Sequence, residues 1–106
     1  MKDVEIKKVP FFGVKAIPPK QHLDRREQIR WTVPDADKGT KATLFFPDAA
    51  AVFGTPVTQE FDPTTGITLT AKDGAPKGKH KYTVSCVIDS EEELAEGLSP
   101  PEVIIN

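Results

Sequence analysis

The sequence predicts an all-β protein, an antiparallel β-sandwich of about seven or eight short strands of immunoglobulin-like or cupredoxin-like type. Apolar residues alternate with polar residues at a period of two in several segments, whereas the period of amphipathic helices is scarcely present. Turn residues separate these segments at intervals of roughly ten residues. The 10 prolines and 7 glycines are spread along the chain, where they end strands and form turns.

The first half of the chain contains four segments with this alternation. They are residues 4–6, 11–17, 29–33 and 42–46. The clearest is 29–33, in which three large apolar residues alternate with polar ones, and its Trp31 is a plausible core anchor. Residues 21–27 are polar and basic, so we expect a long loop or a helical turn there. The alanine-rich residues 49–53 favour one turn of helix.

The second half adds four more segments with strand character. They are residues 57–61, 67–71, 82–88 and 103–105. Residues 62–66 have the composition of a tight turn, and residues 72–79 form a loop rich in Gly, Pro and Lys. The acidic residues 89–96 predict a helical turn or a solvated loop. Tyr82 is a second plausible core anchor.

Composition indicates one globular domain spanning residues 1–106, because 38% of the residues are hydrophobic and 28% are charged. The formal net charge of −2 lacks the basic excess of a nucleic-acid-binding protein. No apolar run is long enough to cross a membrane. Residues 1–8 lack the apolar stretch of a secretory signal, and Cys86 has no cysteine with which to pair. We therefore expect a cytoplasmic protein without membrane or nucleic-acid partners.

Metal and cofactor motifs do not emerge from the sequence. A blue-copper site requires a Cys, two His and usually a Met, but no His follows Cys86 and the sole Met is Met1. His22 and His80 lie in lysine-flanked segments that predict solvated side chains. Residues 35–39 resemble the start of a calcium loop but lack its third acidic position and its distal Glu, which favours an ordinary turn. We expect no metal and no cofactor.

Enzyme motifs are equally weak. The three serines, Ser85, Ser90 and Ser99, lack the Gly-x-Ser-x-Gly context of a nucleophile elbow. Residues 74–79 have the composition of a phosphate loop without its spacing. We therefore predict no multiple-turnover activity. Lysines around His80 and the acidic run after Ile88 form opposite charge patches, which could support head-to-tail association.

The peptide bond between Asp62 and Pro63 has a chemistry of its own. An Asp carboxylate can attack its own backbone carbonyl carbon, close a five-membered anhydride ring and expel the nitrogen of the following proline. The tertiary amide nitrogen of proline is easily protonated once it is twisted, and a tight turn can hold it strained. The candidate catalytic residues are thus Asp62 as the nucleophile and Pro63 as the leaving group.

Asp-Pro-x-x-Gly is also an ordinary turn, in which Asp caps the backbone, Pro sets φ and Gly accepts a left-handed conformation. The sequence does not choose between these two interpretations. It also does not choose the group that protonates the leaving nitrogen. The neighbouring candidates are Glu60, Thr64, Thr65 and His80.

Four short segments resemble the small bacterial proteins of the DP-EP family. These segments are Trp-Thr-Val-Pro at 31–34, Phe-Asp-Pro at 61–63, Lys-Tyr-Thr-Val at 81–84 and Pro-Pro-Glu-Val-Ile-Ile at 100–105. The resemblance spans roughly residues 29 to 105. It implies an antiparallel sandwich of unassigned cellular role whose bond between Asp62 and Pro63 can break spontaneously through an anhydride. The chain departs from the family pattern because it contains no Glu-Pro dipeptide.

The rival hypothesis is a non-catalytic module that binds a protein partner or forms a homodimer. The edges of a sandwich can pair with a second chain, and short uncovered strands at 57–61 or 103–105 would suit such pairing. A small-ligand site between the sheets is a third possibility, but no convergent polar cluster in the sequence supports it.

Overall fold

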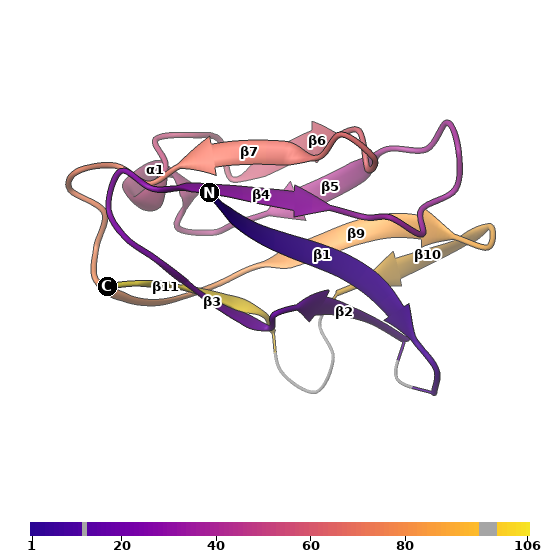
Figure 1. Cartoon of the computed structure of the whole chain (residues 1–106). Coiled ribbons are helices and arrows are strands. Elements are labelled where there is room, and N and C mark those ends of the chain that lie inside the picture. The colour runs from indigo at the N-terminus through magenta and orange to yellow at the C-terminus, as the bar shows by residue number, and fades with distance from the viewer. Residues whose placement is uncertain (12, 96–99) are drawn as a thin grey trace.

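The computed structural model describes residues 1–11, 13–95 and 100–106 and arranges them in three β-sheets around one core (Figure 1). The first sheet has the order β2 (Gly13–Ile17), β1 (Lys2–Val9), β4 (Gln28–Thr32) and β7 (Ile67–Thr70). The second has the order β10 (Glu91–Leu94), β9 (Thr83–Ile88), β5 (Ala42–Phe45) and β6 (Thr58–Phe61). The third has the order β3 (Lys20–Leu23), β11 (Glu102–Ile105) and β8 (Gly78–Lys81), and one helical turn, α1 (Ala49–Val52), follows β5.

The prediction of an all-β sandwich is confirmed, and so is the helical turn at 49–53. Two details differ from the predicted architecture. The described part of the chain contains eleven strands, and two of its strand pairs are parallel, namely β1 with β4 and β3 with β11. No helix among the described residues is long and apolar enough to cross a membrane.

Two predicted loops are in fact strands. Residues 21–27 contribute to β3, and the acidic segment after Ile88 forms β10; residue 96 of that segment lies outside the described residues. Both strands lie at the edge of their sheets; β10 leaves most of its side chains exposed, and β3 buries only Leu23. A strand with polar residues on both faces shows no apolar alternation, so the period-two signal fails there. Part of the predicted 72–79 loop is likewise the start of β8.

Four aromatic side chains occupy the middle of the core. Trp31 from β4 contacts Phe46, Phe53 and Tyr82 edge-on, with ring centroids 6.3, 6.1 and 5.4 Å away. Phe46 stacks on Tyr82 at 5.8 Å and meets Phe53 edge-on at 5.0 Å. Trp31 lies in the first sheet, Phe46 and Tyr82 lie next to β5 and β9 of the second, and Phe53 follows α1, so this aromatic cluster joins the layers. Trp31 and Tyr82 are thus confirmed as core residues.

The sandwich is linked along one side and has free edges on the other. An isolated bridge between Val14 and Ala95 connects the edge strand β2 to the end of β10. On the opposite side β6 and β7 are the terminal strands of their sheets. Figure 1 shows these two strands near each other at the top of the molecule, joined at the right by the turn that contains Asp62 and Pro63.

Two adjacent phenylalanines test the importance of the aromatic cluster. Phe46 is fully buried within it, whereas neighbouring Phe45 is 45% exposed. We expect Phe46→Ala to lower the free energy of unfolding by about 3–5 kcal/mol because it leaves a cavity between stacked rings. Phe45→Ala should cost about 1 kcal/mol or less, because nearly half of this residue is already exposed to water. Urea unfolding of the two variants measures this difference, and equal losses would contradict the assignment of the core.

Candidate functional site at the Asp62-Pro63 turn

The bond between Asp62 and Pro63 lies where the chain passes from one sheet to the other. β6 ends at Phe61 and pairs with β5, whereas β7 begins at Ile67 and pairs with β4. Because β6 and β7 belong to different sheets, the intervening residues form a connection across the top of the sandwich. The predicted turn at 62–66 is confirmed, and its Gly66 N–H donates a hydrogen bond of 2.8 Å to the carbonyl oxygen of Asp62.

The Asp62 carboxylate is held by the backbone of its own turn. Its Oδ1 accepts hydrogen bonds from the N–H groups of Thr64 at 2.8 Å and Thr65 at 3.2 Å. These two donors stabilise the ionised form and lower the pKa of Asp62 below its ordinary value, and the positive charge of Lys41 acts in the same direction. The carboxylate is solvent-exposed, so it stays ionised in mildly acidic solution and is reachable by water.

Pro63 is fixed more firmly than Asp62. It is buried, and its carbonyl oxygen accepts a hydrogen bond of 2.8 Å from the N–H of Val33, just after β4. The acyl side of the bond is also anchored, through the hydrogen bond from Gly66 to the Asp62 carbonyl. Both sides of the candidate scissile amide are therefore attached to the fold by backbone hydrogen bonds.

Gly66 permits the close approach of the turn to β4. Its φ is +84°, a left-handed value that other residues adopt only with strain. A Cβ at this position would lie 2.4 Å from the carbonyl oxygen of Trp31 and 2.8 Å from the Cγ2 of Thr32. The glycine at the end of Asp-Pro-x-x-Gly is thus required both by the backbone conformation and by the neighbouring strand.

A hollow of about 210 Å³ borders the turn. Its walls are formed by residues 36–41, which connect β4 to β5, and by Asp62, Pro63 and Thr64. Lys41 is the cation whose charge influences Asp62 from this loop. The hollow therefore brings ammonium and hydroxyl side chains near the turn, and these groups can donate protons. They come from a loop that the sequence did not indicate as a neighbour of Asp62.

His80 is not one of these donors, and two predictions about it are wrong. It was expected to be solvated and near Asp62, but it is 6% exposed and lies in β8 of the third sheet. Its ring nitrogens bind Asp48 and the carbonyl of Pro76. In the Lys-His-Lys alternation of this strand, the histidine points inward and the lysines point outward. The lysine-rich composition of the segment did not indicate this buried histidine.

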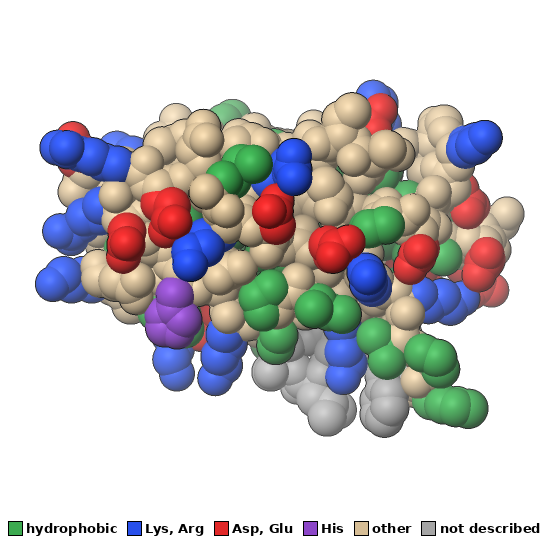
Figure 2. Space-filling view, in the orientation of Figure 1, with side chains coloured by type: hydrophobic (Ala, Val, Ile, Leu, Met, Phe, Trp, Pro, Cys, Tyr) green, Lys and Arg blue, Asp and Glu red, His purple; other side chains and the backbone are tan. Residues whose placement is uncertain are grey.

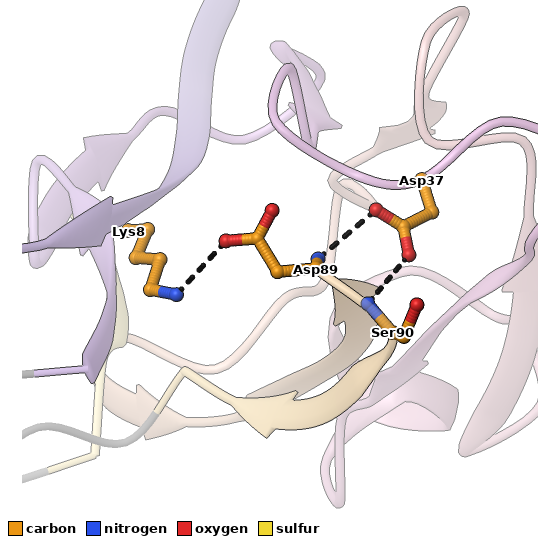
Figure 3. Close-up of polar contacts among 4 residues, drawn as sticks. All are labelled: Lys8, Asp37, Asp89 and Ser90. Carbon is orange, nitrogen blue, oxygen red and sulfur yellow. Dashed lines mark hydrogen bonds and ion pairs between the residues drawn. The ribbon is translucent and has the colours of Figure 1, made fainter.

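The 36–41 loop is fixed in turn to the β9–β10 hairpin. Figure 3 shows that the Asp37 carboxylate accepts hydrogen bonds from the N–H groups of Asp89 at 3.0 Å and Ser90 at 2.8 Å. Lys8 of β1 binds the Asp89 carboxylate at 3.1 Å. Asp89 and Ser90 both have left-handed φ values, 53° and 66°, and Asp37 satisfies their N–H groups in that conformation. The turn expected at residues 35–39 thus holds two loops together at the end of the sandwich that carries Asp62.

The other residues considered from the sequence lie apart from this site. Cys86 is a free thiol in the core, and burial raises its pKa to about 11, which makes it a poor nucleophile. His22 in β3 forms a ring hydrogen bond with Asn106 at 3.0 Å. Among the described residues no group of three His, Cys, Asp or Glu side chains is placed to hold a metal ion. Ser99 lies outside the described residues.

Charged side chains are unevenly distributed over the surface. Figure 2 shows Lys and Arg gathered at the left end of the molecule, whereas acidic side chains are spread across its middle and right among further Lys and Arg. In Figure 1 the loop between β7 and β8 lies at the left end of the molecule, and the acidic strand β10 lies at the right. The two charge patches expected from the sequence therefore lie at different ends of the fold.

No protein-family model matches the chain, and no curated protein is similar to it. The resemblance to the DP-EP family therefore rests on the sequence segments quoted above.

Substitution of Gly66 tests the packing of the turn. Gly66→Ala should lower the free energy of unfolding by at least about 2–3 kcal/mol, because its Cβ would overlap the Trp31 carbonyl and its φ is left-handed. Gly39→Ala is the matched control, since Gly39 has a similar φ of +78° but a Cβ there would meet nothing within 4 Å. That variant should lose about 1–2 kcal/mol from backbone strain alone. Thermal or urea unfolding would refute close packing if the two losses were equal.

Proposed function

We propose that this chain cleaves its own peptide bond between Asp62 and Pro63, once per molecule, through an aspartic anhydride. The observation that supports the proposal is the arrangement of hydrogen bonds around this bond. An ionised carboxylate and the carbonyl that it would attack belong to the same residue, and that carbonyl already accepts an N–H from Gly66 at 2.8 Å. The proposal is consistent with the resemblance to the DP-EP family but does not depend on it.

The reaction begins with attack by a carboxylate oxygen of Asp62 on its own backbone carbonyl carbon. Negative charge develops on the carbonyl oxygen, where the Gly66 N–H stabilises it. The bond to the Pro63 nitrogen then breaks, and that nitrogen gains a proton and leaves as a secondary amine. Water opens the five-membered anhydride, so the balanced result is hydrolysis of one amide into a carboxylate at Asp62 and an amine at Pro63.

The two backbone N–H donors of the turn have opposing effects on this reaction. They weaken the nucleophile, because a hydrogen-bonded carboxylate oxygen is less reactive. They also keep the carboxylate ionised at lower pH, where protons for the leaving nitrogen are more abundant. Both donors bind Oδ1, and no described residue donates a hydrogen bond to Oδ2. Oδ2 is therefore the oxygen to which we assign the attack.

Cleavage would leave a nicked protein with its sheets intact. Residues up to Asp62 remain attached through β6 and its partner β5, and residues from Pro63 remain attached through β7 and its partner β4. The two fragments would therefore stay associated in native buffer. A native gel or size measurement would miss the event, and a denaturing measurement is needed.

Intact mass under denaturing conditions tests the proposal on freshly purified protein stored at neutral and mildly acidic pH. We expect fragments 1–62 and 63–106 to accumulate, faster in the mildly acidic buffer because the leaving nitrogen requires a proton. Asp62→Asn and Asp62→Glu should each slow this cleavage by roughly tenfold or more, since an amide is a weak nucleophile and Glu must close a larger ring.

Gly74→Ala serves as the control with an unchanged cleavage site, because Gly74 lies between β7 and β8, away from the hollow, and a Cβ there would meet nothing within 4 Å. This variant should cleave at the wild-type rate. A parallel sample in concentrated urea separates assistance by the fold from the intrinsic lability of Asp-Pro. A wild-type mass that stays constant would overturn the proposal. Cleavage at the same rate in urea would show that the turn contributes nothing.

We propose homodimerisation through the edge of β6 as the second candidate function. β6 pairs with β5 on one side only, and the exposed Val57 and Phe45 lie beside this edge. The carbonyl oxygen of Val57 accepts a hydrogen bond from the N–H of Phe46. Because the direction of the backbone groups alternates along a strand, Thr58 and Glu60 point their N–H and C=O groups away from β5. The alternative edge at 103–105 was wrongly predicted, because β11 is the central strand of the third sheet.

Light scattering at high protein concentration tests the dimer. Glu60→Pro removes an outward N–H from β6 and should convert the dimer to a monomer. Thr68→Pro is the matched control on β7, the edge strand of the other sheet, and should leave a β6-mediated dimer intact. A wild-type monomer at both low and high salt would exclude this candidate.

A further inference from the structure

His80 makes two short hydrogen-bonding contacts from a buried position. Its Nδ1 lies 2.8 Å from Oδ2 of Asp48, the residue that precedes α1. Its Nε2 lies 2.8 Å from the carbonyl oxygen of Pro76, in the loop that precedes β8. Only 6% of the residue is exposed, so water does not replace these contacts easily. The imidazole thus connects two segments that are distant in the sequence.

Both partners of the ring are hydrogen-bond acceptors. A backbone carbonyl has no proton to donate, and an exposed Asp carboxylate is ionised near neutral pH. A neutral imidazole carries a proton on only one nitrogen, so its second nitrogen would direct a lone pair at an oxygen 2.8 Å away. Both contacts are satisfied only when both ring nitrogens are protonated.

We propose that His80 is a proton-dependent latch, which as an imidazolium fastens the loop at 72–77 to the start of α1 and releases it on losing a proton. The Asp48 side chain supports this role, because it makes no capping hydrogen bond to the helix that follows it. Its carboxylate is therefore available to balance the charge of the ring. The latch is separate from the proposed cleavage site, since none of its residues lines the hollow beside Asp62.

The charged groups around the latch come from several elements. Asp48 provides the negative charge in contact with the ring. On β8 itself, Lys79 and Lys81 are exposed on the opposite face of the strand. On β11 the residue paired with His80 is the apolar Val103. From the segment after β3, the Arg25 guanidinium donates to the Ala75 carbonyl at 3.0 Å, one residue before Pro76.

The loop retains other attachments when the latch opens. Lys72 donates its N–H to the carbonyl of Val52 at 2.8 Å, and Arg25 holds Ala75. Deprotonation of His80 removes one of the ring's two contacts, so the connection between Asp48 and Pro76 opens while the start of the loop stays anchored. Because only the doubly protonated ring satisfies both contacts, we expect the latch to add stability at low pH and to lose this contribution as the pH rises.

Urea unfolding at about pH 5.5 and about pH 8, on either side of the range in which histidine titrates, tests the latch. His80→Gln should lower the urea midpoint more at the lower pH than at the higher. Asp48→Asn should remove most of the pH dependence contributed by His80, because an amide can rotate to accept from Nδ1 or donate to it. His22→Gln is the matched control, since the exposed His22 already binds an amide, that of Asn106.

Nitrogen NMR of the wild-type ring gives a second test that does not depend on how the variants fold. At about pH 6 both ring nitrogens of His80 should show the shifts of protonated imidazolium. A single protonated nitrogen at that pH would overturn the proposal. So would a His80→Gln midpoint that shifts equally at the two pH values.

Discussion

The contact of Trp31 with Phe46, Phe53 and Tyr82 is the interaction on which the arrangement of the layers depends. Trp31 belongs to the first sheet, while Phe46 and Tyr82 flank strands of the second. Edge-on and stacked rings have defined separations, so this aromatic cluster sets the distance between the sheets and the position of the short helix. With no disulfide available to the single Cys86, this packing supplies the cohesion of the fold.

Two carboxylates organise the loops at one end of the sandwich. Asp62 accepts two N–H groups within its own turn, and Asp37 accepts two from the β9–β10 turn. The loop that carries Asp37 also borders the hollow beside Asp62, so the Asp37 loop and the Asp62 turn face each other across this hollow. Reactivity proposed at Asp62 therefore depends on a loop whose position is fixed by a different part of the chain.

Strands with an apolar buried face could be predicted from the sequence, whereas edge strands made mostly of polar residues could not. Alternation revealed β4, β7 and β9, in which apolar side chains enter the core. It missed β3 and β10, because edge strands of polar residues carry no such signal. The Asp-Pro-x-x-Gly motif revealed its turn, since that chemistry is local. The wall at 36–41 and the pairing of His80 with Asp48 were not predictable, because they depend on contacts between distant segments.

The pairing of β3 with β11 has a consequence for the order in which the protein forms. Residues 20–23 find their strand partner only at residues 102–105, and β8 pairs with the same late segment. During synthesis the first of these strands must wait without a partner until nearly the whole described chain has left the ribosome. Such distant pairing slows folding, because the entropy lost in closing a long loop precedes any stabilising contact between the strands. Shortening the chain by its last strand would leave two strands of that sheet without a template.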